Sequence, residues 1–297
     1  MNYVTEWKER DLDNGFTYQW NPDDENSPIL KITKSSLGTY GFCRASYRMS
    51  YDPLGEGKIS QPANEAMLRG TEAHNAQEDF WKAVDVDDAM NYIDDPNKLA
   101  KSFLDLYPET PDEITSALYR SMASWSAERF IDCVKEGIVE FFKPVGNEVR
   151  LNARIELNGV EIHLQGIIDR LFIVDGGYTP LELKTGVWKD SKATHMRKEM
   201  AFYKILFDNA TDEEKIAEGL DPNMEFTNWG WFFPASNYIF LEPVKARTEV
   251  SVEKAMQKLV DSYILTEFPF DDFYKKCRAC GLFSICEKGE KSIGYDW

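Results

Sequence analysis

Apolar and polar residues alternate through the middle of the chain, and this pattern gives the first structural prediction. Within residues 148–157 the apolar residues share one face: Val149, Leu151, Ala153, Ile155 and Leu157. Alternation with period two is typical of a half-buried strand. Asn158-Gly159 follows and favours a type I′ hairpin turn, because both central residues of that turn need positive φ. We therefore expect a hairpin that continues in a second strand over residues 160–174.

The flanking patterns predict the other elements. Gly176-Gly177 offers a second tight turn, and residues 179–185 are expected to form a third strand. Residues 60–140 are mainly helical by pattern, interrupted by an acidic loop near 85–88 and a proline-rich turn near 108–111. Downstream we expect a helix at about 191–209, strands at 228–233 and 238–241, and a helix at about 252–266. The fold class is therefore mixed α/β (α+β), with the core order αβββαβ.

The predicted turns fix a pairing register. If each turn holds two residues, Glu148 lies opposite Asp169, and Asp169 lies opposite Lys184 with Glu182 on the same face. Directly opposed Cβ atoms are about 5 Å apart and diagonal ones about 7–8 Å. A bulge in the long second strand would flip part of this register. Because Asp169 and Glu182 have apolar neighbours, their charges are costly to bury, and a bound cation would offset that cost.

Three segments together resemble the PD-(D/E)xK nuclease superfamily. They are Gly70-x-x-x-His74-x-x-x-Glu78, Gly166-x-x-Asp169-Arg170 and Glu182-Leu183-Lys184. The resemblance is to the RecB-like branch, which includes the CRISPR-associated iron–sulfur exonucleases and the AddB nuclease domain. It spans residues 36–290 and implies a restriction-endonuclease-like αβββαβ core with a helical insertion. Each segment alone is common, and all of them in this order are specific.

The resemblance implies a metal-dependent phosphodiesterase site. His74, Asp169 and Glu182, with the Leu183 carbonyl, would hold Mg²⁺ or Mn²⁺, and an imidazole ligand shifts preference somewhat toward Mn²⁺. Lys184 would orient the attacking water and counter charge in the transition state. Supporting residues are Glu148, Glu78 and Arg170. His74 and Glu78 share one face of a helix expected over residues 65–84, being four positions apart.

The chain departs from the family pattern at one position. The family usually carries Gln-x-x-x-Tyr on the helix after the lysine strand, whereas this chain has Glu199 and Tyr203 at those positions. Tyr203 would support the site or contact the nucleic acid. Glu199 cannot donate an amide hydrogen bond. Ordinary helix surface is the alternative interpretation of this pair.

Four of the five cysteines resemble an iron–sulfur ligand set. Cys277, Cys280 and Cys286 cluster near the C-terminus, and Cys43 is distant. The resemblance implies a [4Fe–4S] cluster bound to the C-terminal segment, and the alternatives are Zn²⁺ held by the same thiolates or no metal at all. No signal peptide or membrane-spanning apolar run is found, which favours the cytoplasm, where disulfides are disfavoured. Cys133 is expected to be a buried apolar side chain.

The net charge of −17 is unusual for a DNA enzyme, because phosphate binding relies on Lys and Arg. Basic residues nevertheless follow the lysine strand and flank the cysteines: Lys184, Lys189, Lys192, Arg197, Lys198, Lys275, Lys276 and Arg278. We expect a local basic track through an otherwise acidic surface.

These observations predict an irregular segment over residues 1–35 and one nuclease domain over 36–290. Its parts would be helices at 60–140, a catalytic sheet at 145–245, and a helix with the cysteines at 250–290. The expected function is a Mg²⁺- or Mn²⁺-dependent DNA exonuclease. Single-stranded DNA or DNA ends would be its substrate, with a protein partner in a recombination, repair, replication or CRISPR-type complex. The alternatives are a non-catalytic DNA-binding subunit that keeps the fold, and an endonuclease.

Overall fold

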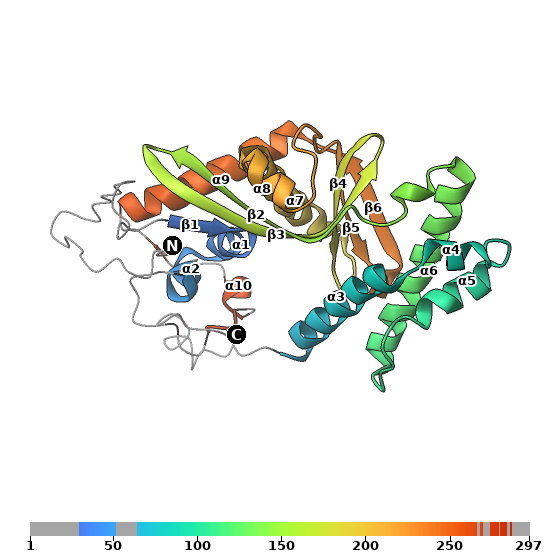
Figure 1. Cartoon of the computed structure of the whole chain (residues 1–297). Coiled ribbons are helices and arrows are strands. Elements are labelled where there is room, and N and C mark those ends of the chain that lie inside the picture. The colour runs from blue at the N-terminus through green and yellow to red at the C-terminus, as the bar shows by residue number, and fades with distance from the viewer. Residues whose placement is uncertain are drawn as a thin grey trace. The chain divides into compact units, whose positions relative to one another are not determined.

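The computed structural model describes residues 30–51, 64–265, 268–269, 274–278, 280–283 and 286. Internal contacts divide the chain into two units. Unit 1 takes its described residues from Met1–Pro62, Asn152–Gly166 and Arg247–Trp297, and unit 2 takes them from Ala63–Leu151 and Ile167–Ala246. Figure 1 shows the elements of both units.

Unit 1 contains β1 (Leu30–Thr33), α1 (Lys34–Phe42), α2 (Arg44–Tyr51), α9 (Ala246–Ile264) and α10 (Tyr274–Arg278). β1 pairs in parallel with the first half of β3 (Val160–Val174). Thr33 caps α1, because its side chain accepts a hydrogen bond from Ser36 N at 3.1 Å. The irregular segment expected to reach residue 35 therefore gives way to a strand and a capped helix. Residues 1–29 lie outside the described part of the chain.

Three helices of unit 2 start at aspartate caps. α3 (Glu65–Ala83) begins after Asn64, whereas α4 (Val86–Met90), α5 (Pro96–Leu104) and α6 (Glu113–Glu136) begin after aspartates. The segment expected as an acidic loop near 85–88 is in fact the start of α4, where Asp85 accepts hydrogen bonds from Asp87 N and Asp88 N. Part of the acidic composition therefore serves to cap helices.

The strands of unit 2 follow the predicted order. β2 (Gly146–Leu157) and β3 contribute one half each to unit 2, and β4 (Gly177–Leu183), β5 (Asn228–Phe233) and β6 (Tyr238–Pro243) lie wholly within it. β4 is antiparallel to β3 and parallel to β5, and β6 is antiparallel to β5. α7 (Ala193–Asn209) and α8 (Asp212–Ala217) connect β4 to β5. Short 3-10 turns occur at Val139–Phe141, Asp190–Lys192 and Pro234–Ser236. The αβββαβ order is thus confirmed.

The first hairpin turn matches the prediction and the second does not. Asn158 and Gly159 have φ of 53° and 75°, as a type I′ turn requires. The second turn is Asp175-Gly176, with φ of 52° and 75°, so Val174 pairs with Gly177. The predicted register is therefore wrong by two residues, and its continuation sets Asp169 across from Glu182, not Lys184. A shift of two preserves the face of every side chain, so the predicted convergence survives.

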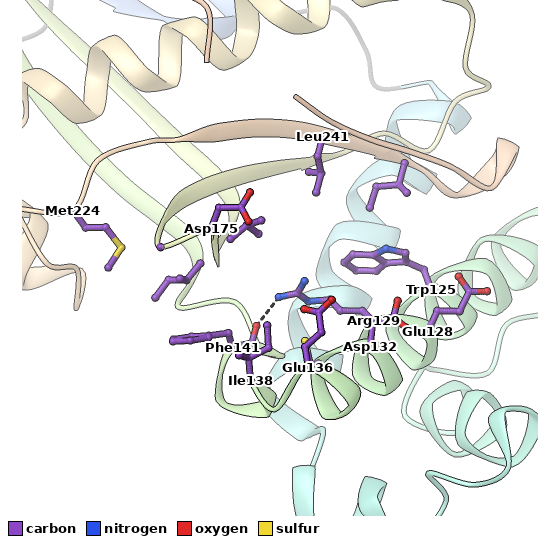
Figure 2. A pocket seen from close by; sticks show the side chains of 15 residues that line it. Trp125, Glu128, Arg129, Asp132, Glu136, Ile138, Phe141, Asp175, Met224 and Leu241 are labelled. Carbon is purple, nitrogen blue, oxygen red and sulfur yellow. Dashed lines mark hydrogen bonds between the residues drawn. The ribbon is translucent and has the colours of Figure 1, made fainter. Parts of the chain in front are cut away.

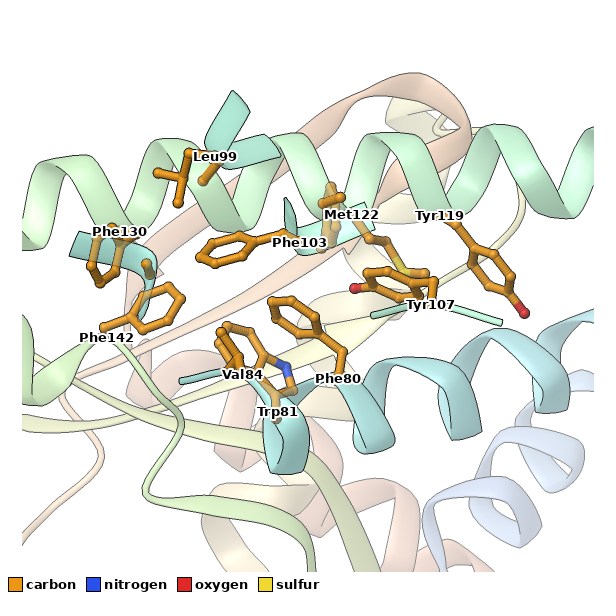
Figure 3. Close-up of a cluster of buried hydrophobic side chains, with 14 of the residues drawn as sticks. Phe80, Trp81, Val84, Leu99, Phe103, Tyr107, Tyr119, Met122, Phe130 and Phe142 are labelled. Carbon is orange, nitrogen blue, oxygen red and sulfur yellow. The ribbon is translucent and has the colours of Figure 1, made fainter. Parts of the chain in front are cut away.

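An aromatic core joins the helices of unit 2 to its strands. Figure 3 shows Phe80 and Trp81 of α3 packed among rings from α5, α6 and the segment before β2. Phe103 lies 5.4 Å from Phe80 and 5.9 Å from Phe142, centroid to centroid. Rings of this size dominate core energetics, so this cluster fixes α3 against the strands. None of the helices in the described part of the chain is long and apolar enough to cross a membrane.

The close approach of β5 and β6 depends on Gly230. A Cβ there would lie 2.3 Å from Leu241 Cδ2 and 2.5 Å from the backbone carbonyl oxygen of Phe240. We predict that Gly230→Ala lowers the free energy of unfolding by about 1–3 kcal/mol through overpacking. The matched control is Gly41→Ala, because nothing lies within 4 Å of that added Cβ and alanine favours the helix by about 1 kcal/mol. Denaturant unfolding gives the free energy of unfolding of both variants. Equal changes in the two would contradict overpacking at Gly230.

Candidate active site

The Gly-x-x-x-His spacing brings α3 against the end of β4. Gly70 and His74 are one helical turn apart and face the same way. A Cβ on Gly70 would lie 3.7 Å from Thr185 Oγ1, and His74 Nε2 lies 3.1 Å from the Leu183 carbonyl oxygen. Gly70 therefore lies in van der Waals range of the residue after Lys184, and the histidine one turn later reaches the strand.

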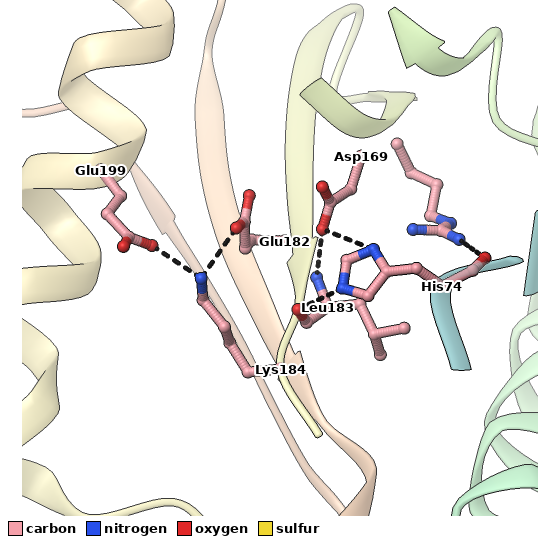
Figure 4. Close-up of polar contacts among 7 residues, drawn as sticks. His74, Asp169, Glu182, Leu183, Lys184 and Glu199 are labelled. Atoms are coloured by element: carbon pink, nitrogen blue, oxygen red, sulfur yellow. Dashed lines mark hydrogen bonds and ion pairs between the residues drawn. The ribbon is translucent and has the colours of Figure 1, made fainter. Parts of the chain in front are cut away.

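Asp169 links His74 to β4. Its Oδ2 lies 3.5 Å from His74 Nδ1 and accepts a hydrogen bond from Leu183 N at 3.0 Å (Figure 4). Asp169 is only 7% exposed. The predicted grouping of His74, Asp169 and the Leu183 carbonyl is therefore present in the structure.

Glu148 completes a compact group of possible ligand atoms. One ligand atom each from His74, Glu148 and Asp169 lie within 4.8 Å of one another. The backbone of Glu148 has φ of 55°, an uncommon conformation for a non-glycine residue that costs about 1–3 kcal/mol. Such strain persists only where the surroundings hold the residue in place. Sequence reasoning ranked Glu148 as a supporting residue, whereas the structure groups it directly with His74 and Asp169.

Glu182 and Lys184 form a second polar group beside the first. Lys184 Nζ donates to Glu182 Oε1 at 2.8 Å and lies 3.0 Å from Glu199 Oε2 of α7 (Figure 4). Glu182 is 3% exposed, so the ammonium offsets a charge that is costly to bury. Glu199 stands where the family usually has glutamine, and its carboxylate accepts from a lysine, as an amide oxygen also could.

These contacts set the protonation of the site. Burial alone would lower the pKa of Lys184, but the carboxylates of Glu182 and Glu199 outweigh it and raise the pKa above its usual value. For Tyr203 the effect of burial is the opposite: it raises the pKa of the phenol, and the charges of Glu182 and Asp169 raise it further. Lys184 is therefore an ammonium and Tyr203 a neutral phenol at neutral pH.

The predicted supporting residues occupy two kinds of place. Arg170 is 1% exposed and donates to the His74 carbonyl oxygen at 3.1 Å. Burial lowers its pKa, while Asp169 and Glu148 act to raise it, so the guanidinium lies near the site carboxylates. Glu78 instead forms a surface ion pair with Lys82 at 2.6 Å, one turn beyond His74.

An ion-pair cluster on β6 fixes the helix that carries Glu199 and Tyr203. Arg197 contacts Glu242 through both carboxylate oxygens, at 2.5 and 3.1 Å, and Trp229 Nε1 donates to Glu242 at 3.0 Å. Burial would raise the pKa of Glu242, but hydrogen bonds from Arg197, Lys245 and Trp229 lower it to about 2. Arg197 was expected in a basic track, and its charge is instead paired here.

A separate cavity in unit 2 has the wrong charge for phosphate. It encloses about 800 Å³ between α6 and the strand ends (Figure 2). Its lining includes the carboxylates of Glu128, Asp132, Glu136 and Asp175. Its one guanidinium, Arg129, donates to the carbonyl oxygens of Phe141 and Phe142. We therefore place any phosphodiester chemistry at the His74 group and not in this cavity.

The donor set of the His74 group fits a hard divalent cation. Carboxylate and carbonyl oxygens suit Mg²⁺ and Mn²⁺, and one imidazole is compatible with Mn²⁺. The available donors are His74, Glu148, Asp169 and the Leu183 carbonyl. Glu182 of β4 is a further candidate, because the β3–β4 register sets it across from Asp169. The two carboxylates of the compact group, Glu148 and Asp169, repel one another, and a bound cation would remove that cost.

Three of the four predicted cluster cysteines lie near the C-terminus of unit 1, and Cys43 follows α1. All four are partly exposed, whereas Cys133 is buried as expected. Cys280 N donates to the Cys277 carbonyl oxygen at 3.0 Å, so these two share one turn. Lys276 Nζ donates to the Phe42 carbonyl oxygen at 3.2 Å, which brings the neighbours of Cys277 and Cys43 together. Within the described residues, the four sulfur atoms do not converge as closely as the His74 group.

Comparison with known proteins identifies the family. The model of the PD-(D/E)XK nuclease superfamily matches residues 31–287, so the chain belongs to this superfamily. Nucleases of this superfamily use divalent metal ions, in agreement with the His74 group. One solved structure, described as the crystal structure of SSO0001, is 14% identical, with a TM-score of 0.33. That match covers 75% of this chain and 97% of the other. No curated protein matches significantly.

Two features near the site were not predicted from the sequence. His195 Nε2 lies 3.1 Å from Glu199 Oε1, so Glu199 faces both a lysine and a histidine. Trp188 lies four residues after Lys184 and stacks on rings of β5 and β6. The alternation of Trp229, Trp231 and Phe233, followed by Tyr238 and Phe240, is the sequence signal that could have revealed this aromatic cluster.

Metal binding at the His74 group predicts a stability change that needs no activity assay. A ligand that binds only the folded state at 100 times its Kd stabilises it by about 2.7 kcal/mol. We expect saturating Mn²⁺ to raise the melting temperature of the wild type, and Glu148→Gln to remove most of that rise. Glu156→Gln, an exposed position on the same strand, is the control and should keep it. Equal shifts in all three proteins would exclude Glu148 as a ligand.

Proposed function

We propose that this protein is a metal-dependent deoxyribonuclease of the RecB-like branch, acting as an exonuclease on single-stranded DNA or DNA ends. One observation carries the proposal: the compact His74–Glu148–Asp169 group lies beside a charged Lys184 in a chain of this superfamily. A cation site beside an ammonium can activate water and stabilise the charge that develops when a phosphodiester is hydrolysed.

His74, Glu148, Asp169 and Glu182, with the Leu183 carbonyl, are the residues that would hold Mg²⁺ or Mn²⁺. When bound, such an ion polarises a phosphoryl oxygen and lowers the pKa of water. Arg170 positions one ligand, because it holds the backbone of His74 at 3.1 Å. Leu183 N positions another, because it donates to the Asp169 carboxylate at 3.0 Å.

Lys184 has a donor left for the reaction. An ammonium carries three N–H groups, and two are directed to Glu182 at 2.8 Å and Glu199 at 3.0 Å. The third can donate to the attacking water or to a phosphate oxygen. Because the pKa of Lys184 is raised, it acts as a cation and hydrogen-bond donor, not as a general base.

DNA is the proposed substrate, and processing in recombination, repair, replication or CRISPR-type pathways is the proposed context. The exposed Lys189 and Lys198 support a basic track near the site, although the chain as a whole is acidic. A protein partner with basic residues would suit that acidic surface. The helices of residues 60–140 would restrict access to a single threaded strand.

Lys184→Ala tests the activity. We expect the wild type to degrade end-labelled linear single-stranded DNA with Mn²⁺ or Mg²⁺ and to leave circles intact. Loss of one preorganised charge at a transition state costs about 10²–10³ in rate, so the variant should be slower by that factor. Lys101→Ala, an exposed lysine of α5, should match the wild type. Equal rates for Lys184→Ala and wild type would refute the mechanism, and cutting of circles would identify an endonuclease.

We also propose that Cys43, Cys277, Cys280 and Cys286 hold a [4Fe–4S] cluster. The partly exposed sulfurs, the shared turn of Cys277 and Cys280, and the Lys276 contact to Phe42 support this. A four-iron cluster spaces its thiolates more widely than a single ion does, so close convergence is not required. The alternative occupant is Zn²⁺.

Anaerobic purification distinguishes the two occupants. We expect brown protein with broad visible absorption, about four irons and four sulfides per chain, and loss of the colour in Cys280→Ser. Cys133→Ala, at the buried fifth cysteine, should keep the colour. Colourless protein with one zinc per chain would show that the cysteines bind zinc and not a cluster.

A further inference from the structure

The segment between β4 and α7 brings an aromatic residue next to the candidate site. Trp188 is partly exposed, and it follows Lys184 by four residues. Its backbone N–H donates to Ser236 Oγ at 2.8 Å, and its indole N–H donates to Asp190 Oδ1 at 3.1 Å. Two hydrogen bonds therefore fix both the backbone and the ring plane of this residue.

Strand pairing places the rings below Trp188 on the same face as the catalytic carboxylate. Glu182 pairs with Trp231 across β4 and β5, and Trp231 pairs with Phe240 across β5 and β6. Directly paired side chains share a face, and neighbouring strands are about 4.8 Å apart. A row of aromatic side chains therefore begins one strand away from Glu182, at Trp231.

Trp188 stacks on these aromatic side chains. Its ring lies 4.5 Å from Tyr238 with an interplanar angle of 14°, and 5.8 Å from Trp231 with an angle of 23°. Phe233 meets it edge-on at 5.2 Å. These partners all come from β5 and β6, so the exposed part of the Trp188 ring faces away from them.

Lysines lie on both sides of Trp188 along the chain, at positions 184, 189 and 192. Lys192 Nζ donates to the Val187 carbonyl oxygen at 2.5 Å and lies 5.1 Å from the centre of the Phe233 ring. Burial, then the charges of Lys189 and Lys184, lower the pKa of Lys192. Asp190, which holds the indole, is the acidic residue within this loop.

A core role does not account for this tryptophan. Trp229 and Trp231 are 0% and 1% exposed and do belong to the core, whereas Trp188 is partly exposed and its neighbour Val187 is 57% exposed. An ordered, partly exposed ring among lysines is the combination that binds single-stranded nucleic acid, because bases stack on the ring and lysines meet the backbone.

We propose that Trp188, supported by Tyr238, is a stacking site for one nucleobase of the DNA strand, next to the nucleotide whose phosphodiester is cut. Lys189 and Lys192 meet the adjacent phosphates. Stacking accepts every base, because each has a π-face, so the site fixes the position of the strand without selecting its sequence. This inference rests on DNA being the substrate, as proposed above.

The test measures binding of fluorescein-labelled oligothymidylate by anisotropy in EDTA, so that no cleavage occurs. A series of oligonucleotides carries one abasic nucleotide at successive positions. For wild type we expect one position at which base removal weakens binding by about fivefold to a hundredfold, the range found for one stacked base. Trp188→Ala should weaken binding of intact DNA by the same factor and be insensitive to base removal at that position. Trp188→Phe should restore most of the affinity.

Two controls separate stacking from folding. Trp125→Ala, at another partly exposed tryptophan in the acidic cavity, should bind as wild type does. Melting temperatures show whether each variant folds, and Trp188→Phe provides the test if Trp188→Ala does not. A Trp188→Ala protein that binds like wild type, or that loses the same affinity for intact and abasic DNA, would overturn the proposal.

Failure of the proposed nuclease activity gives a different result. If the wild type never cuts DNA but shows the abasic-sensitive position, the stacking site stands and the catalytic assignment falls. If the wild type cuts DNA and no position is sensitive, the catalytic assignment stands and the stacking site falls.

Discussion

Mutual repulsion among buried carboxylates is the constraint on which the rest of the site depends. Glu148 and Asp169 come together with His74, Glu182 lies on the neighbouring strand β4, and Asp169 and Glu182 are almost fully buried. Anionic groups removed from water are stable only when cations or hydrogen bonds compensate them. Lys184 compensates Glu182, and Leu183 N and His74 contact the Asp169 carboxylate. A divalent ion at the His74 group would compensate the negative charge of its carboxylates further.

The surrounding architecture keeps these charges together. The aromatic cluster fixes α3, so that His74 reaches the Leu183 carbonyl, and Glu242 fixes α7, so that Glu199 reaches Lys184. The aromatic surface of β5 and β6 then continues the same face outward to Trp188. The candidate carboxylates, Lys184 and the proposed stacking residue Trp188 thus lie on β2, β3 and β4 or in the loop that follows β4.

The local patterns predicted much of this, and the tertiary contacts limited the rest. Alternation over residues 148–157 and the Asn158-Gly159 turn gave β2 and β3 to within two residues. The second turn was misplaced because Asp175, like glycine, tolerates positive φ. The resulting register shift was two residues, so each side chain stayed on the predicted face of the sheet. The sequence could not show that Glu148 lies directly in the His74 group, since its positive φ depends on tertiary surroundings. Trp188 was missed because its partners lie on distant strands. The single-domain organisation over 36–290 stays a prediction.

Anomalous diffraction from crystals soaked in Mn²⁺ tests the central claim most directly. The account predicts a peak in contact with the side chains of His74, Glu148 and Asp169 and close to the Leu183 carbonyl. Mn²⁺ bound elsewhere on the protein, with these side chains touching no ion at saturating concentration, would contradict it.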